Sequence, residues 1–137
     1  MDAKRFKYTK PTELTGRGKT RVNLFKGEIS YASVLIVQVD GHNNLHSHRH
    51  HEGTWFVLKG RARFYTADDE IVGEFGPYEG ILIPRNFPYW FESCSGEDLE
   101  ILQIEATDGP EGDDEARDRV DYTPRRSEQN VTVIDAK

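Results

Sequence analysis

The sequence predicts an all-β protein, either a sandwich or a barrel, and two observations carry this prediction. Short runs rich in β-branched and aromatic residues recur at intervals of about ten residues, with glycine, proline and acidic residues between them. No window of helical length repeats its apolar side chains with the period of about 3.6 residues that an amphipathic helix requires. Short strands at such regular spacing are typical of antiparallel sandwiches and barrels.

The expected strands follow one another through most of the chain. In order, they cover residues 21–25, 31–39, 54–58, 61–66, 71–75, 81–84, 88–93 and 99–106. Between the third and the fourth of these runs, Lys59-Gly60 predicts a tight hairpin, because Gly60 can adopt a positive φ.

The chain changes character after the last of these strands. Residues 107–130 are polar and rich in charged side chains. We expect a charged surface excursion there, with one short helical turn around 111–119. An edge strand is then expected at 131–134, on the same subunit or on a neighbouring one.

Length and composition limit the class of protein. With 137 residues the chain has the size of one compact domain, so we expect a single domain, residues 1–137, with its barrel at about 21–106. Cys94 is the only cysteine, which excludes an intramolecular disulfide and a cysteine-based zinc site. No apolar run approaches the roughly 20 residues of a transmembrane helix, and the charged start of the chain lacks the apolar segment of a secretory signal. We therefore predict a cytoplasmic protein that does not bind membranes.

Charge is distributed unevenly along the chain. The net charge is -6, yet residues 1–26 hold eight lysines and arginines against two acids, and residues 97–121 hold eleven acids against two arginines. The basic residues are not interleaved with stacking aromatic residues, and the total charge opposes phosphate binding. We therefore expect no nucleic-acid partner, and we expect the two oppositely charged segments to lie near each other, within one subunit or across a dimer.

Four of the five histidines fall within six residues. On a continuous strand, alternate side chains share a face. One face would then carry His46, His48, His50 and Glu52, and His51 would point the opposite way. Imidazole nitrogens and a carboxylate oxygen suit Zn, Fe, Mn, Ni or Cu. This face therefore predicts a metal site, and a solvated polar turn is the alternative.

Two motifs, of which the first contains this histidine cluster, give the sequence a resemblance to the cupin superfamily. His46-Ser-His48-x3-Glu52 with the following VLKG, and the later IPRNFPYWF, are similar to the two motifs of that family, and the resemblance covers about residues 41–104. It implies a small RmlC-like, double-stranded β-helix (jelly-roll) barrel, a homodimer, and a site for a small-molecule ligand inside the barrel. It also implies a divalent transition metal (Fe, Mn, Ni or Zn) held by His46, His48 and Glu52, since the first motif of metal-dependent cupins supplies two histidines and a glutamate.

The first motif departs from the family spacing. Its first histidine lies one residue closer to the opening glycine than is usual, and its glutamate lies one residue farther from the closing glycine, Gly60. A slip of one residue reverses the face that a strand residue presents, and counting back from Gly60 puts Gly53 at the glutamate position. A β-bulge at Gly53 would restore the expected ligands. His50 is kept as a candidate ligand or catalytic residue in case the pairing differs.

The second motif carries Tyr89 where the family has its last histidine. Asn86 stands at a turn position where glycine is usual, and asparagine also tolerates left-handed backbone. Tyrosine, with an ordinary pKa of about 10, is a poor ligand for Zn or Ni unless it is deprotonated. Tyr89 could ligate ferric iron, act as a general acid, or pack in the barrel with its hydroxyl satisfied. In the last expected strand, Gln103 and Glu105 share a face with apolar neighbours, so either could reach the interior.

Three functions follow from these residues and this resemblance. The first is a metal-dependent enzyme, with isomerase and oxygenase chemistry both open, acting on a small polar molecule such as a carbohydrate derivative. The second is a metal-free sugar isomerase, epimerase or dehydratase in which a histidine and Tyr89 exchange protons with the substrate. The third is a module that binds or senses a small molecule without turnover. The fold alone does not decide among them. We favour the first, because three imidazoles and a carboxylate exceed what acid/base catalysis requires.

Overall fold

The computed structural model describes residues 2–14, 18–39, 41–122 and 131–136. The strands, in chain order, are β1 (Lys19–Lys26), β2 (Ser30–Val37), β3 (His46–His48), β4 (His51–Lys59), β5 (Ala62–Tyr65), β6 (Ile71–Phe75), β7 (Gly80–Ile83), β8 (Trp90–Ser93), β9 (Leu99–Thr107), β10 (Arg119–Asp121) and β11 (Val131–Asp135). The helical elements of the described residues are short: η1 (Ala67–Asp69), η2 (Pro110–Asp113) and α1 (Glu115–Asp118). None of these helices is long and apolar enough to cross a membrane.

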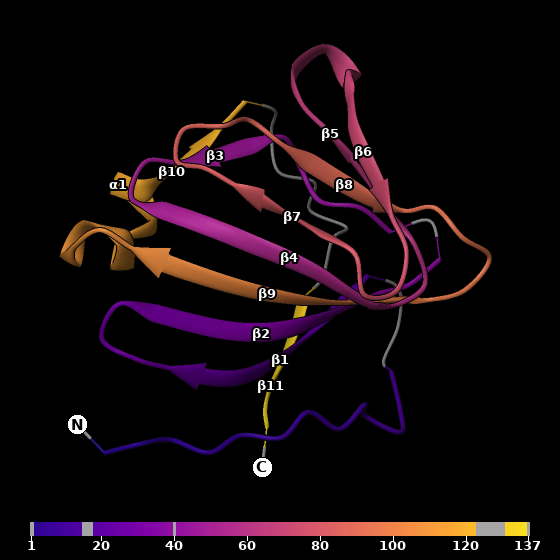
Figure 1. Cartoon of the computed structure of the whole chain (residues 1–137), viewed down its shortest axis with the longest axis horizontal. Helices are drawn as coiled ribbons and strands as arrows, with labels where there is room; N and C mark the ends of the chain where they lie inside the picture. Colours follow the sequence, from indigo (N-terminus) through magenta and orange to yellow (C-terminus); the bar gives the residue numbers. More distant parts are fainter. Residues whose placement is uncertain (1, 15–17, 40, 123–130, 137) are drawn as a thin grey trace.

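Two layers of sheet enclose the interior (Figure 1). The first layer has the strand order β11-β1-β2-β9-β4-β7, and the second has the order β6-β5-β8. β3 pairs with β10, and it continues the second layer because a β-bridge joins His46 to Tyr89, immediately before β8. The pairings between described strands are antiparallel except that of β11 with β1, at the edge of the first layer. The predicted all-β barrel is confirmed.

The turn at Gly60 differs from the expected hairpin. Gly60 has a φ of 85°, as expected for the residue after Lys59. However, β4 pairs with β7 and β9 in the first layer, while β5 pairs with β6 and β8 in the second. The hairpin prediction was wrong, because this turn carries the chain from one layer to the other. Glycine is also required by space, since a Cβ at this position would lie 2.8 Å from the carbonyl oxygen of Asp98.

The apolar core occupies one end of the barrel. Its buried side chains come from both layers and are Leu35, Val37, Trp55, Val57, Ala62, Phe64, Ile83, Tyr89, Phe91, Leu99 and Ile101. Along β9, the buried inward side chains change from Leu99 and Ile101 to Gln103 and Glu105. The interior therefore becomes polar toward the end of β9, and the histidine-bearing strands lie at this polar end.

Both charged segments contact strands of the barrel. In the basic N-terminal segment, the Tyr8 hydroxyl donates to the Glu100 carboxylate at 2.6 Å, and the Lys10 ammonium lies 3.6 Å from the same group. The acidic segment after β9 is more than the expected surface excursion, because α1 and β10 return it to β3 and bury Asp118. β11 then lies beside β1 of the same chain.

Candidate functional site

A bend between β3 and β4 determines which histidines face the interior. Arg49 and His50 form this bend, so β3 and β4 are not one continuous strand. The alternation of faces therefore restarts at His51. His46 and His51 are buried, and the His48 side chain is 17% exposed. The structure thus brings together three imidazoles, of which sequence parity had placed His51 on the wrong face.

The expected positions of Glu52 and His50 were wrong for the same reason. β4 pairs with β9 in unbroken register through Gly53, so the bulge expected there is absent, and the irregularity lies at the preceding bend. Gly53 faces the interior and Glu52 is exposed on the outer face of β4. The His50 ring lies outside as well, with its Nδ1 3.0 Å from the Asp108 carboxylate. Neither Glu52 nor His50 lines the cavity described below.

Asp118 joins two of the inward histidines. It ends α1 immediately before β10, which pairs with β3. Its Oδ2 accepts hydrogen bonds from Nδ1 of His48 and Nδ1 of His51, both at 2.6 Å, and its Oδ1 accepts one from the backbone N–H of His50 at 2.8 Å. Burial would raise the pKa of Asp118, but these hydrogen bonds outweigh it and the pKa lies below its ordinary value. Because each ring donates from Nδ1, a neutral ring leaves Nε2 with a lone pair.

His46 lies beside Tyr89. Their backbones exchange hydrogen bonds of 2.9 and 3.1 Å, and their ring centroids are 4.6 Å apart. The His46 Nδ1 donates to the carbonyl oxygen of Asn44 at 2.6 Å, which leaves Nε2 as an acceptor. Burial, together with repulsion from Arg119, lowers the pKa of His46 to about 3. Burial, together with the Glu105 carboxylate, raises the pKa of Tyr89 well above its ordinary value. Both side chains are therefore neutral near pH 7.

Glu105 adds a second carboxylate to the interior, as its strand parity predicted. It is 1% exposed and lies opposite Gly53 in the pairing of β9 with β4. Its Oε1 accepts a hydrogen bond from the Gln103 amide at 2.8 Å, while its Oε2 is buried without a partner among the described residues. Burial raises the pKa of Glu105, and the hydrogen bond from Gln103 opposes that rise only in part.

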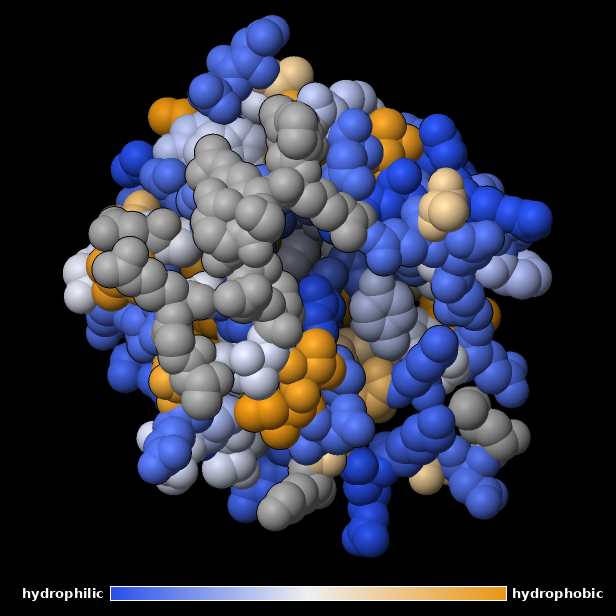
Figure 2. Space-filling view, turned by 180° about the vertical axis from the view of Figure 1, so that it is seen from behind, coloured by the Kyte–Doolittle hydropathy of each residue, from blue (hydrophilic) through white to orange (hydrophobic). Residues whose placement is uncertain are grey.

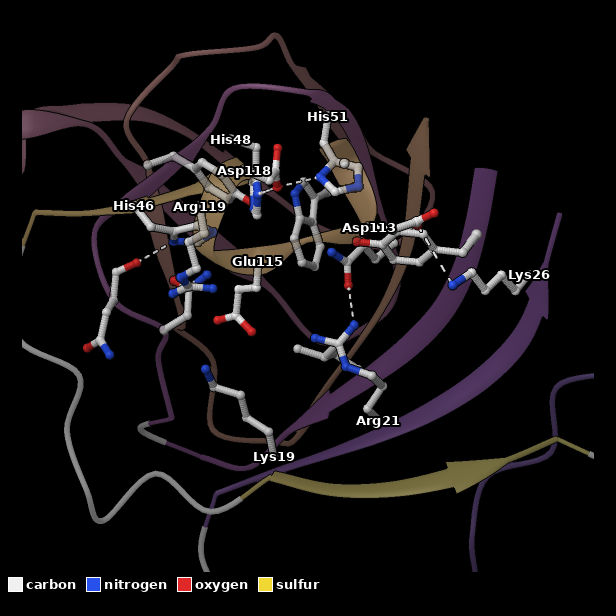
Figure 3. A pocket seen from close by; sticks show the side chains of 18 residues that line it. Lys19, Arg21, Lys26, His46, His48, His51, Asp113, Glu115, Asp118 and Arg119 are labelled. Carbon is white, nitrogen blue, oxygen red and sulfur yellow. Dashed lines mark hydrogen bonds and ion pairs between the residues drawn. The ribbon is translucent and has the colours of Figure 1, made fainter. Parts of the chain in front are cut away.

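The three inward histidines, Asp118 and Tyr89 line a cavity of about 530 Å³ (Figure 3). Its charged lining residues are Lys19, Arg21, Lys26, Asp113, Glu115, Asp118 and Arg119. Burial, with repulsion from Arg119 and Arg21, lowers the pKa of Lys19 to about 8. The wall of the cavity therefore carries charges of both signs: Arg119 lies 2.8 Å from the Asp121 carboxylate and Lys26 lies 3.7 Å from that of Asp113. Seen from behind, the molecule is largely hydrophilic and is hollowed near the centre of this face (Figure 2).

The donor atoms fit a divalent transition metal. His48, His51 and Asp118 each offer one ligand atom, and these atoms lie within 4.8 Å of one another. The His51 Nε2 is buried without a hydrogen-bond partner among the described residues, and such an atom is costly to leave unpaired. The three groups could bind an ion directly, or Asp118 could orient the two imidazoles, as carboxylates do for metal-bound histidines. In either arrangement, nitrogen and oxygen donors suit Fe, Mn, Ni or Zn.

Sequence reasoning found part of this cluster and missed His51 and Asp118. His51 could have been found from the spacing alone, because counting back from Gly60 already put Gly53, and with it His51, on the inward face. Asp118 had no local signal. It lies 70 positions from His48 in a segment whose many acids look alike in sequence, and only the pairing of β10 with β3 brings it inside.

This architecture is similar to that of solved cupin structures, and these confirm the predicted double-stranded β-helix fold. The cupin domain of Schizosaccharomyces pombe Cnp3 is 17% identical, with a TM-score of 0.65 over 74% of each chain. A Klebsiella pneumoniae protein with a double-stranded β-helix domain is 16% identical, with a TM-score of 0.64 over 77% of this chain and 91% of that one.

An RmlC-like cupin family protein from Methanocaldococcus jannaschii is 14% identical, with a TM-score of 0.62 over 78% of this chain and 93% of that one. No protein-family model matches the sequence, and no curated protein matches it. At these identities the likeness extends to the fold, and function has to be argued from the site.

Proposed function

We propose that this cupin-fold chain is a metal-dependent enzyme in which His48, His51 and Asp118 hold a divalent transition metal ion. One observation carries the proposal: two inward imidazoles share a single oxygen of a buried carboxylate, at 2.6 Å each, inside a cavity large enough for a small molecule. His46 lies next to this group, with its ring centroid 5.0 Å from that of His48. In this proposal His48 keeps its expected metal-binding role, His46 lies beside the site without being one of the three proposed ligands, and Glu52 has no role because it is exposed on the outer face of β4.

The side chains around this group suggest how a substrate would be held. A bound ion would supply a Lewis acid for an oxygen of the substrate. Arg21 donates to Gln103 at 3.0 Å, and this contact fixes its guanidinium at the cavity wall. Lys19 and Arg119 line the same cavity, so we propose a small polar substrate that carries a carboxylate or phosphate group. Carbohydrate acids and sugar phosphates belong to this class.

A metal-free isomerase, epimerase or dehydratase is the second candidate. The contact between His46 and Tyr89, at 4.6 Å between ring centroids, is the observation that favours it. Against it, proton exchange near pH 7 is most efficient with groups that titrate near that pH. The pKa of His46 lies at about 3 and that of Tyr89 is raised further from neutrality. A module that binds an anion without turnover would use the same cavity, and it would need no metal.

Metal analysis of protein purified without a histidine tag or chelator tests the proposal. We expect about one equivalent of Fe, Mn, Ni or Zn in the wild type, and a loss of at least about tenfold in metal affinity in His51→Asn. His50→Asn is the matched control, because His50 is the adjacent residue in sequence and its ring lies outside the cavity. A wild type that neither contains metal nor takes up added metal ions would contradict the proposal and bring the metal-free candidates forward.

The expected homodimer, the cytoplasmic location and the absence of nucleic-acid and membrane partners stay predictions. Of these, the oligomeric state can be measured directly on the purified protein. Light scattering on the same purified sample measures it.

A further inference from the structure

We propose that Glu105 of β9 supplies a carboxylate oxygen to the metal ion, and that Gly53 of β4 keeps the space in which this carboxylate lies. This inference rests on the proposed metal site. It adds to that site a residue from a strand that carries none of the histidines.

Gly53 and Glu105 are in direct contact across two neighbouring strands. They face each other directly in the antiparallel pairing of β4 with β9. A Cβ at Gly53 would lie 2.7 Å from Oε1 and 3.0 Å from Oε2 of Glu105, so any other residue at position 53 would displace the carboxylate. Glycine is unfavourable in the interior of a strand, because it has no side chain to pack and loses the most conformational freedom. Its presence here is explained by the close approach of Glu105.

The Glu105 carboxylate is held in place from one side. The Gln103 amide donates to Oε1 at 2.8 Å, and the Gln103 carbonyl oxygen in turn accepts from Arg21 at 3.0 Å. This chain of contacts orients the carboxylate and leaves Oε2 as the atom without a partner among the described residues. A carboxylate that is 1% exposed is unstable as an isolated anion, so Oε2 calls for a proton or a cation.

The surroundings of Glu105 favour a cation shared with the histidines. In the described part of the chain, no lysine or arginine forms an ion pair with Glu105. His51 and Gly53 both face inward from β4, and Glu105 lies opposite Gly53 on β9, so the Glu105 carboxylate and the His51 ring lie on the same inward face of neighbouring strands. His51 itself has a buried Nε2 without a partner among the described residues. Two unpaired acceptor atoms in one polar interior cannot satisfy each other without a proton or a metal ion, and a metal ion would satisfy both.

A metal titration of the full chain tests this inference. Metal-free protein is titrated with Zn²⁺ and with Mn²⁺ in competition with a chelator, for the wild type, Glu105→Gln and Glu52→Gln. We expect Glu105→Gln to lose at least about tenfold in affinity for both ions. The control Glu52→Gln removes an exposed carboxylate from the adjacent position of β4, and it should change the affinity by no more than about twofold.

The melting temperature of the metal-free proteins separates binding from structure. Removing a buried, unpaired carboxylate should leave the metal-free Glu105→Gln protein as stable as the wild type or more stable, while reducing the rise in melting temperature that metal produces. A variant that melts lower without metal but binds metal as the wild type does would show that Glu105 is only structural, and would overturn the inference.

A relocated carboxylate provides the second variant. Gly53→Glu combined with Glu105→Gly moves the carboxylate to the opposite strand and removes the clash, and we expect it to recover metal affinity relative to Glu105→Gln. If Glu105→Gln binds metal normally, or if the relocated carboxylate restores nothing, the inference fails while the proposed metal site stands. If the wild type binds neither ion, both fail.

Discussion

The interior of this barrel has two halves that differ sharply along a single strand. On the inward face of β9, Leu99 and Ile101 belong to the apolar half, which is the core cluster around Phe64 and Phe91. Gln103 and Glu105, farther along the same face, belong to the polar half, which also contains the three inward histidines and Asp118. One strand with one alternation of faces thus serves packing at its start and the proposed chemistry at its end.

The two halves also differ in how well their groups are satisfied. The described residues contain three buried side-chain atoms without a hydrogen-bond partner: His51 Nε2, Trp55 Nε1 and Glu105 Oε2. Two of them belong to the polar half, and Trp55 lies at the boundary, paired with Gln103 across the strands. Unpaired buried polar groups oppose folding, so the apolar half supplies stability and the polar half carries unpaired atoms that a ligand could use.

The largest effect on stability is expected from the apolar half. Phe64 is fully buried, and its ring centroid lies 4.9 Å from that of Phe91. Phe64→Ala should lower the free energy of unfolding by about 3–5 kcal/mol, through lost burial and the cavity that remains. Urea unfolding of the metal-free protein measures the change. A loss below about 1 kcal/mol would show that the apolar half is not the main source of stability.

A smaller effect, with a different signature, is expected from His46 in the polar half. Its pKa is about 3 in the folded protein and 6.5 as the ordinary value. Between these values the unfolded chain binds a proton that the folded chain does not, so stability falls as the pH falls below about 6.5, by at most about 1.4 kcal/mol per pH unit. His46→Gln should remove this contribution.

Unfolding curves between pH 7 and 5, with chelator present, distinguish the two kinds of variant. A milder core variant, Phe64→Leu, should lower the free energy of unfolding by a similar amount at every pH. His46→Gln should instead flatten the dependence of the free energy of unfolding on pH. Equal slopes for His46→Gln and the wild type would contradict the assignment of His46 as a buried neutral imidazole.

The sequence predicted the apolar half better than the polar half, for a physical reason. Strand periodicity determines which side chains point inward, and because β9 is regular it correctly put Gln103 and Glu105 on the face that could reach the interior. Asn86, expected to tolerate left-handed backbone, has a φ of 66°. Periodicity fails where a strand is interrupted. The bend at Arg49 and His50 reversed the parity, and so exchanged Glu52 for His51.

Long-range pairing was beyond the reach of sequence patterns. Asp118 reaches the site only because β10 pairs with β3, a contact between segments about 70 positions apart. Nothing in the local sequence distinguishes Asp118, which is buried, from the other acids of its charged segment. The same limitation applied at Gly60, where the positive φ and the strands on either side were predicted correctly but the pairing of those strands as a hairpin was wrong.

The smallest effect is expected at Tyr89, which connects the two halves. Its ring belongs to the core cluster and stacks on Phe64 at 6.2 Å between centroids, while the residue also lines the cavity beside His46. Tyr89→Phe keeps the ring and removes only the hydroxyl. We expect the free energy of unfolding to change by less than about 1 kcal/mol and the metal affinity by no more than about twofold, because packing accounts for the position of the ring. Urea unfolding and the same chelator competition measure both. A marked loss of metal affinity in Tyr89→Phe would instead place the hydroxyl in the metal site. Tyr89 would then belong to the polar half of the interior.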